Sequence, residues 1–387
     1  MNRIVFGSAN HWTSPCQVGS HAWARLFASH DWETAYLSDP VTPWHWLASG
    51  SRRQNHQRFD LWRHPRQFPE SGRLCSWVPG SLIAPRNQLF FRSSWTLKNW
   101  ASLSWPPVAD KVREMGFDSP DALWLDSVRH IYWAKQIHPR KIILRVADWS
   151  AGFGSVPPSI LKLEESLVRE SDMVIASAET LSEKLKDWRG KAPLFTIRNG
   201  VDTSFWSAPL PEPPEYAGIP APRAVYVGAL DHWFDLQLLL DTARGLPGIQ
   251  FVIIGNRKFD LPSVSPSNLH WLGSRNRNVV PAYLQFAQAG IIPFKRNELI
   301  DCVCPLKLYE YMACGLPVIA TRWKELEHMQ SPALLATGAD EWIEGLKKLA
   351  AVSPSQKQIF QQYARANDWN VRWQQWTDAW REIMKKA

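Results

Sequence analysis

Short apolar runs alternate with segments of helical periodicity along most of the chain. In the first half, the apolar runs that predict strands lie at residues 3–9, 34–37, 123–125, 141–146, 173–177 and 194–197. Helical patterns fall between several of these runs, near residues 20–29, 160–170 and 180–188. Strands that alternate with helices are typical of βαβ units around a parallel sheet. The pattern therefore predicts an α/β domain, which we place at residues 1–205.

A proline-dense segment separates this domain from a second α/β series. Because proline suits neither a helix interior nor a central strand, we interpret residues 206–222 as a linker. Beyond it, strand patterns lie at residues 224–228, 251–255, 269–273, 290–294 and 318–320, with a helix at 236–244. These elements predict a second domain at 223–365. Functional sites in such folds lie at the carboxyl ends of the strands, which we expect to face a cleft between the domains.

The chain ends in helical patterns. Trp369, Trp373, Trp376 and Trp380 fall on one stripe of a helix, which predicts a packed seam. We expect the helix at 366–387 to pack back toward the first domain.

Length and composition agree with two globular domains. The chain has 387 residues, of which 45% are apolar and 21% charged. The five cysteines are an odd, scattered set, and Cys302-x-Cys304 has no second pair, so neither a zinc site nor a disulfide framework is predicted. No signal peptide and no apolar run of about 18 residues is apparent. These features favour a reducing cytoplasm.

Residues 40–107 interrupt the alternation, because they are rich in proline, arginine and tryptophan; we expect a long excursion with short helices. The net charge of +8 would attract nucleotide-sugar phosphates, anionic lipid head groups or nucleic acid. Aromatic residues of this excursion lie among basic ones: Trp62, Trp77, Phe90, Phe91, Trp95, Trp100 and Trp105 among Arg63, Arg66, Arg73, Arg86, Arg92 and Lys98. Such a mixture is found where proteins contact membranes, although a tryptophan-rich core would look similar.

The segment 304–320, CPLKLYEYMACGLPVIA, carries the most specific chemistry. Pro305 opens a short helix that places Lys307 and Glu310 on one face, and Gly315 ends it before a buried strand. The free N–H groups at the helix start and the Lys307 ammonium suit a diphosphate, and the Glu310 carboxylate suits ribose hydroxyls. Leu308, Tyr311 and Met312 line the opposite face. The alternative is an ordinary surface ion pair.

Three signatures in order give the chain a family resemblance: NGVDTSFW at 199–206, VGAL at 227–230 and PLKLYEYMACGLPV at 305–318. With them the chain resembles bacterial glycosyltransferases of the GT-B fold (family 4-like), which have two Rossmann-like domains. The first half is more loosely similar to membrane-associated glucuronosyltransferases of xanthan-type exopolysaccharide assembly. The features that carry this second likeness are the Ser8-Ala-x-x-Trp12 start, the helix with His21, and Leu144-Arg-Val-Ala-Asp148.

The resemblance implies that the second domain holds a nucleotide sugar and the first an acceptor. It places Glu310 on the ribose and Lys307 near the diphosphate, with Leu306 and Tyr309 beside them. The loop that starts at Gly273 would bracket the base. Gly228 fits a turn that approaches the ligand closely, or simply a tight turn. Arg257 is a further candidate for phosphate contact, or a solvated side chain.

The resemblance also bears on mechanism. Retaining members carry two glutamates eight positions apart, and Cys302 stands where the first would be, which favours inversion. An inverting transfer needs a general base, for which Asp148 is the candidate and Asp126 the runner-up, each following a predicted strand. Asp148 could instead cap the turn into residues 149–154. His21 would orient the acceptor or serve as a structural hydrogen-bonding residue. The chain has no Asp-x-Asp sequence, so we expect no metal and no cofactor besides the nucleotide-sugar donor.

The leading hypothesis is a glycosyltransferase of cell-surface polysaccharide synthesis. It would use a UDP-sugar and a saccharide acceptor, such as a polyprenyl-diphosphate-linked one. It would be cytoplasmic and peripheral on the anionic inner face of the plasma membrane. Two alternatives remain: a nucleotide-sugar 2-epimerase of the same fold, and a non-enzymatic basic nucleic-acid-binding protein, against which the lack of a nucleic-acid motif counts.

Overall fold

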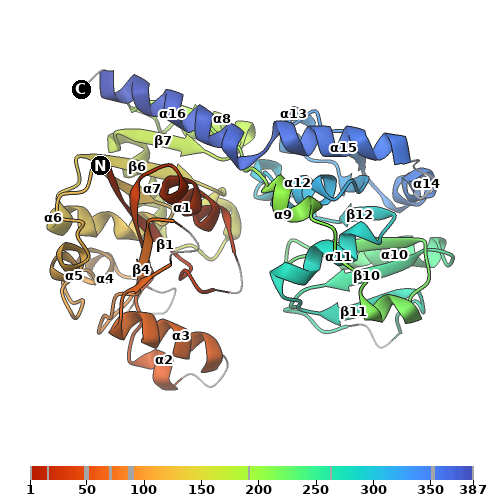
Figure 1. The fold of residues 1–387 in the computed structure, drawn as a ribbon, viewed down its shortest axis with the longest axis horizontal. Helices are drawn as coiled ribbons and strands as arrows, with labels where there is room; N and C mark the ends of the chain where they lie inside the picture. Colours follow the sequence, from red (N-terminus) through yellow and green to blue (C-terminus); the bar gives the residue numbers. More distant parts are fainter. Residues whose placement is uncertain are drawn as a thin grey trace. The chain divides into compact units, whose positions relative to one another are not determined.

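The computed structural model describes residues 2–14, 17–47, 52–68, 72–85, 91–190, 192–261, 264–349 and 354–385. The chain divides into two compact units (Figure 1). The first comprises Met1–Ile197 with Gln375–Ala387, and the second Arg198–Gln374. None of the described helices is both long and apolar enough to cross a bilayer.

An eight-stranded sheet forms the centre of the first unit, in the order β3-β4-β2-β1-β5-β6-β7-β8. Its strands are β1 (Arg3–Ser8), β2 (Glu33–Ser38), β3 (Arg66–Gln67), β4 (Leu74–Trp77), β5 (Ala122–Leu125), β6 (Lys141–Val146), β7 (Met173–Ala176) and β8 (Leu194–Thr196). All pairs are parallel except β3 with β4. Because β1 pairs with both β2 and β5, the strand order reverses there, and ligands bind at such points in open parallel sheets.

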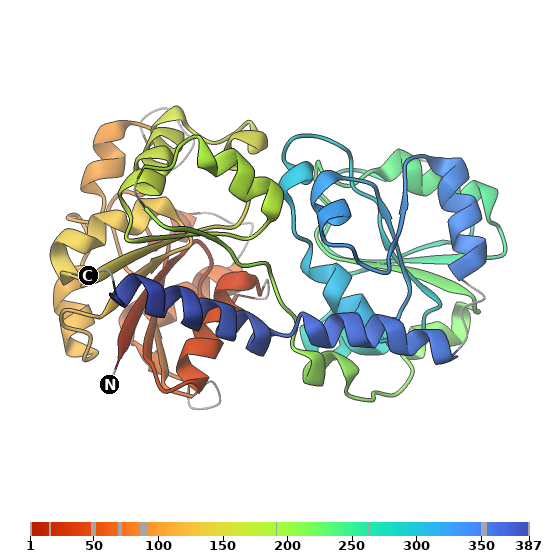
Figure 2. The ribbon, with the colours of Figure 1, turned by 90° about the horizontal axis from the view of Figure 1, so that it is seen from above.

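Helices cover both sides of this sheet (Figures 1 and 2). They are α1 (Gly19–Ser29), α2 (Trp44–Leu47), α3 (Arg52–Arg63), α4 (Ser94–Asn99), α5 (Val108–Glu114), η3 (Val128–Trp133), α6 (Ala134–Ile137), η4 (Ser150–Phe153), α7 (Pro158–Glu170) and α8 (Glu179–Lys186). The core is aromatic: the ring centroid of Phe6 lies 5.6 Å from that of Phe27 and 5.3 Å from that of Trp124. The end of α16 (Trp369–Lys385) adds Trp376, whose centroid lies 4.5 Å from that of Phe27.

The segment 40–107 differs from the expected excursion. It contains the short helices, but it also contributes β4, which pairs parallel with β2 and is buried along its length. The strand escaped prediction because only four residues, Leu-Cys-Ser-Trp, form it, and two of them are small and weakly apolar. Phe90 and Arg86 lie outside the described residues.

The second unit is built on a parallel sheet in the order β11-β10-β9-β12-β13-β14. Its strands are β9 (Arg223–Val227), β10 (Gln250–Ile254), β11 (Leu269–Gly273), β12 (Ala289–Ile292), β13 (Val318–Thr321) and β14 (Leu334–Ala336). Its helices are α9 (Thr203–Ser207), η5 (Pro214–Gly218), α10 (Leu236–Gly245), η6 (Arg277–Val279), α11 (Val280–Gln285), η7 (Ile300–Cys302), α12 (Leu306–Ala313), α13 (Lys324–His328), α14 (Ala339–Leu349), α15 (Pro354–Ala366) and the start of α16. Here the order reverses between β9 and β12, which marks their carboxyl ends as the expected ligand site.

The proline-rich residues 206–222 pack within this second unit. Tyr216 is buried, and its hydroxyl donates a 2.8 Å hydrogen bond to the carbonyl of Tyr283. The Arg223 guanidinium lies 4.1 Å from the centroid of the Tyr216 ring and donates to the carbonyl of Ile219. The segment is therefore anchored to the sheet that it precedes.

Candidate functional site

Helix α12 has the form predicted for the segment 304–320. It follows Pro305, which supplies no side-chain cap, and Gly315 ends it with a φ of +73°. The backbone just before the helix is held by a residue far away in the sequence, because the Asn199 side chain donates a 2.8 Å hydrogen bond to the carbonyl of Cys304. The predicted inner face, Leu308, Tyr311 and Met312, is fully buried. The first N–H groups of the helix therefore receive no side-chain cap.

Lys307 and Gly228 meet at the point where the strand order reverses. The Lys307 ammonium lies 5.2 Å from the ring centroid of Tyr226, on β9, and 5.0 Å from that of Phe294, beyond β12. A Cβ atom at Gly228 would stand 2.9 Å from the Lys307 ammonium nitrogen, and the φ of Gly228 is +151°. Only glycine combines this backbone with so close an approach. Two residues that are 79 positions apart in sequence are thus brought together.

Glycines end three neighbouring strands at this edge. The Gly228 N–H donates to the carbonyl of Ile254 at 2.9 Å, and the Gly255 N–H donates to the carbonyl of Gly273 at 3.1 Å. Gly228, Gly255 and Gly273 therefore add no side chains of their own to this edge. Arg257 is exposed in the loop after β10, where it bridges to Leu230, and no described residue hydrogen-bonds its side chain.

Glu310 is half-buried, and no described residue forms a hydrogen bond or salt bridge with its carboxylate. Burial raises the pKa of Glu310, and the charges of Lys307 and Arg277 oppose the rise. Arg277 comes from the loop after β11, and its guanidinium lies 3.8 Å from the ring centroid of Phe205. Sequence reasoning predicted that this loop contacts the base but missed Arg277, because its proximity to Glu310 is a tertiary contact.

Two predicted neighbours of Lys307 differ in how they could reach a ligand. Leu306 is half-buried at the start of α12. The Tyr309 side chain is fully buried; its ring stacks on Tyr363 with centroids 6.0 Å apart, and its hydroxyl lies 3.5 Å from the Cys304 sulfur. Only its backbone could contact a donor. Cys302, where retaining relatives carry a glutamate, is also fully buried.

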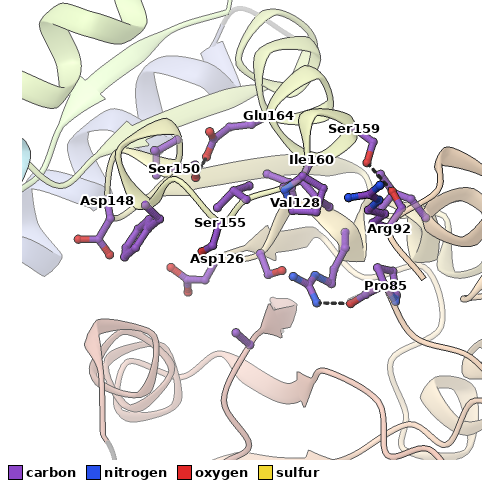
Figure 3. A pocket seen from close by; sticks show the side chains of 18 of the residues that line it. Pro85, Arg92, Asp126, Val128, Asp148, Ser150, Ser155, Ser159, Ile160 and Glu164 are labelled. Atoms are coloured by element: carbon purple, nitrogen blue, oxygen red, sulfur yellow. Dashed lines mark hydrogen bonds between the residues drawn. The ribbon is translucent and has the colours of Figure 1, made fainter. Parts of the chain in front are cut away.

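The first unit contains a cavity of about 410 Å³ where its own strand order reverses (Figure 3). Ala9 and Asp126, which follow β1 and β5, line it together with Asp148 beyond β6. Arg92, Arg129, Arg145, Ser150 and Glu164 are among the other lining residues. The cavity thus has three carboxylates and three guanidinium groups in its wall.

Asp126 has both carboxylate oxygens engaged. One accepts a 2.7 Å hydrogen bond from Arg145, and the other a 2.9 Å hydrogen bond from the indole of Trp124. The side chains of Arg145 and Asp126 are 4% and 7% exposed. Both oxygens of Asp126 are therefore already occupied by donors from the protein.

Asp148 has the opposite surroundings. Its side chain is exposed and forms no hydrogen bond to a described residue, whereas its neighbours in the chain are held. The Ser177 hydroxyl donates to the carbonyl of Ala147 at 2.6 Å, and the Trp149 ring lies 5.0 Å from that of Trp188. The chain is therefore held on both sides of Asp148, and no described residue hydrogen-bonds its carboxylate.

His21 does not line the cavity. Its ring is fully buried, with Nε2 3.1 Å from the carbonyl of His11 and Nδ1 accepting from the N–H of Val18 at 3.3 Å. Burial lowers the pKa of His21 to about 4. These contacts are those of a structural histidine, which was the alternative interpretation of this residue.

Glu164 was not predicted, and it is a buried acid in the wall of the cavity. It is 5% exposed; one carboxylate oxygen accepts a 2.8 Å hydrogen bond from the Ser150 hydroxyl, and the other has no partner among the described residues (Figure 3). Burial, and then the charge of Asp148, raise the pKa of Glu164 to about 7. From sequence it resembles any other acid on an amphipathic helix.

The raised pKa of Glu164 predicts a stability difference with pH. The native carboxyl keeps its proton up to a pH of about 7, whereas the unfolded one releases it near its ordinary value of 4.5, so the unfolding free energy falls as pH rises between them. The contribution is about 3 kcal/mol at most. We expect Glu164→Gln to flatten this decline in urea unfolding curves at pH 5 to 8. Glu165→Gln, which removes an exposed ion pair with Arg169, should leave it unchanged. An equal slope in wild type and Glu164→Gln would contradict the assignment.

The aromatic residues of the segment 40–107 divide between core and surface. Trp77 and Trp100 are fully buried, as a tryptophan-rich core requires. Trp44, Leu82, Trp95 and Trp105 are instead 53%, 65%, 63% and 70% exposed. Leu82 and Trp105 also line an apolar groove of about 190 Å³ with Val41, Phe59 and Trp62. Contiguous exposed apolar patches often mark surfaces that contact a protein or a membrane.

Three comparisons with known proteins bear on this geometry. Residues 221–351 match the family model described as Glycosyl transferases group 1. The chain is 24% identical over 245 residues to TuaH of Bacillus subtilis (strain 168), provisionally named a teichuronic acid biosynthesis glycosyltransferase. That match covers 58% of this chain and 59% of the length of TuaH.

Similar solved structures extend over the full chain. Sucrose-phosphate synthase of Thermosynechococcus elongatus has a TM-score of 0.69 at 15% identity, covering 100% of both chains. HepE of Anabaena, in complex with UDP and glucose, has a TM-score of 0.67 at 13% identity, covering 99% of this chain and 100% of HepE. The trehalose-6-phosphate synthase OtsA has a TM-score of 0.68 at 14% identity, covering 98% of each chain. The predicted GT-B fold, with two parallel-sheet α/β domains, is confirmed.

Proposed function

We propose that this chain, whose residues 221–351 form a glycosyltransferase group 1 domain, transfers a sugar from a nucleotide diphosphate sugar to a saccharide acceptor. The observation that carries the proposal is the meeting of Lys307, Gly228 and Glu310 where the strand order reverses. There the Lys307 ammonium lies near the rings of Tyr226 and Phe294 and beside Gly228. No described residue hydrogen-bonds the nearby Glu310 carboxylate.

The donor is a UDP-sugar in this proposal. The Lys307 ammonium and the uncapped start of α12 bind the diphosphate, and Glu310 accepts hydrogen bonds from the ribose. Arg277, whose charge acts on Glu310, lies on the loop proposed to contact the base. The complexes of HepE with UDP and with UDP-glucose support this choice, because they show that the same fold holds that donor in another protein.

The transfer proceeds with inversion, and the acceptor binds in the cavity of the first unit. Asp148 removes the proton of the acceptor hydroxyl as its oxygen attacks the anomeric carbon, and the bond to the UDP oxygen breaks. Lys307 and the α12 N–H groups stabilise the negative charge on the departing diphosphate. We propose that no metal ion takes part in this step.

The acceptor in this proposal is a lipid-linked saccharide of cell-surface polysaccharide synthesis, carried on a polyprenyl diphosphate. The name of TuaH supports the polysaccharide. The exposed Trp44, Leu82, Trp95 and Trp105 support contact with a lipid surface, since aromatic side chains are enriched at the bilayer interface. We place the protein in the cytoplasm, peripheral on the anionic inner face of the plasma membrane.

A thermal-shift screen with nucleotides and UDP-sugars tests the proposal. A ligand that binds only the native state raises the melting temperature, so UDP and at least one UDP-sugar should raise it and CMP should not. The sugar donor that gives the largest shift is then incubated alone and with membrane lipid extract. Transfer that requires the extract supports a glycosyltransferase, whereas conversion of the sugar without it would indicate an epimerase. No shift with any nucleotide would contradict the proposal.

Gly228→Ala should weaken UDP binding about tenfold, which corresponds to about 1.4 kcal/mol. The added methyl group would displace the Lys307 ammonium and strain the backbone, whose φ is +151°. Isothermal titration with UDP measures the effect. Gly248→Ala is the matched control, because a Cβ there meets no atom within 4 Å. Equal affinities of the two variants for UDP would show that Gly228 is not part of the donor site.

A further inference from the structure

The residues on either side of Asp148 are held by separate contacts. Ala147 is held through Ser177 and Trp149 through Trp188, as described above. The third tie comes after Asp148, where the Ser150 hydroxyl donates to Glu164 at 2.8 Å. Glu164 thus connects the segment that carries Asp148 to helix α7.

This third tie differs from the others because it is ionisable and buried. Glu164 is 5% exposed, and a buried carboxylate with one unpartnered oxygen is costly to keep. Buried ionisable groups with shifted pKa values that line a cavity often belong to a functional site. The same helix offers a contrast in Ser166, whose hydroxyl donates to Glu170 at 2.9 Å on the exposed side.

Glu164 and Asp148 also interact through space. The charge of Asp148 raises the pKa of Glu164, and because coupling between two titrating groups is mutual, a charged Glu164 makes Asp148 a stronger base. Most other charges around the cavity are already paired. Arg145 pairs with Asp126, and Arg129 pairs with Asp39. The side chain of Arg92 is exposed.

We propose that Glu164 is a positioning residue for the base Asp148: through Ser150 it fixes the segment that carries the carboxylate, and its negative charge strengthens that carboxylate as a proton acceptor. The inference rests on the proposed function, since it needs Asp148 to remove a proton. It predicts that the rate of the transferase depends on the ionisation of Glu164 as well as on that of the base.

The test measures UDP release from the UDP-sugar that gives the largest thermal shift, with water as acceptor, at pH 5.5 to 8. In wild type we expect the rate to rise through a pH of about 7 as Glu164 becomes charged. Glu164→Gln copies the neutral form. It should match wild type within about twofold at pH 5.5 and be about three- to tenfold slower at pH 8, because a shift of one pKa unit changes ionisation about tenfold. KM for the donor should not change, and Glu164→Asp should restore part of the pH dependence.

Ser150→Ala should lower the rate at both ends of the pH range, while Ser166→Ala, the exposed Ser–Glu pair, should be silent. A constant ratio between wild type and Glu164→Gln at all pH values would overturn the inference and mark Glu164 as merely structural. A second measurement needs no turnover: carboxyl ¹³C NMR should show a lower pKa for Glu164 in Asp148→Asn than in wild type, because the charge of Asp148 raises it. An unchanged Glu164 pKa overturns the inference. A lowered one in a protein that releases no UDP leaves the coupling standing and overturns the proposed function.

Discussion

Asp148→Asn should slow sugar transfer by about 10²- to 10⁴-fold, the usual contribution of a general base, and leave UDP affinity unchanged. Asparagine keeps the size and the hydrogen-bonding shape of the side chain but cannot take a proton. The segment around it stays anchored through Ala147 and Ser150, so the geometry of the cavity should persist. Single-turnover rates with saturating donor and membrane lipid extract measure the chemical step, and titration with UDP measures binding.

The matched control is Asp118→Asn, an exposed aspartate that lies 3.8 Å from Arg113. It should transfer sugar at the rate of wild type. Asp126→Asn is expected to behave differently from both, because it breaks the buried pair with Arg145 and should lower stability by about 3 kcal/mol or more. If Asp148→Asn transfers sugar nearly as fast as wild type, the base is another residue.

Lys307→Ala should weaken UDP binding by about 10- to 100-fold, since hydrogen bonds to charged groups contribute about 1.5–3 kcal/mol each. The loss should be larger for UDP than for uridine, because the ammonium is assigned to the diphosphate. Glu310→Ala should weaken UDP and uridine equally, because the carboxylate is assigned to the ribose that both contain. Titration of each variant with both ligands separates the two assignments.

A surface ion pair was the alternative interpretation of Lys307 and Glu310, and the chain offers a control of that kind. Lys347 and Glu344 on α14 form an exposed pair three positions apart at 2.7 Å. Lys347→Ala should change neither ligand's affinity. UDP binding by Lys307→Ala as tight as by Lys347→Ala would show that the segment 304–320 does not hold the diphosphate.

The sequence predicted most of the strands because a strand buried on both faces leaves a continuous apolar run. β6, at Lys141–Val146, has the predicted bounds, and β1 ends one residue earlier than expected. β4 failed the same criterion, because its four residues gain their burial from β2 and the layers around it and carry little signal of their own.

The residues of the candidate site also fall into two groups, those with a signal in the local sequence and those without one. Lys307, Glu310 and Gly228 belong to short local signatures, so their positions could be predicted before any contact was known. Arg277 and Glu164 carry no such signature. Their significance depends on Glu310 and Ser150, which are 33 and 14 positions away and reach them only through the folded chain. For His21, a polar residue early in a helix, the sequence could not distinguish a ligand contact from burial beneath Trp12.

The first unit contains residues from both ends of the chain, which has a consequence for folding during translation. Trp376 is 1% exposed against Phe27 and Trp32, yet the whole second unit lies between these residues in the sequence. The aromatic layer of the first unit therefore stays open on the ribosome until almost the entire polypeptide has emerged. A fragment of residues 1–197 alone should aggregate, and addition of a peptide of residues 369–387 in trans should restore its solubility.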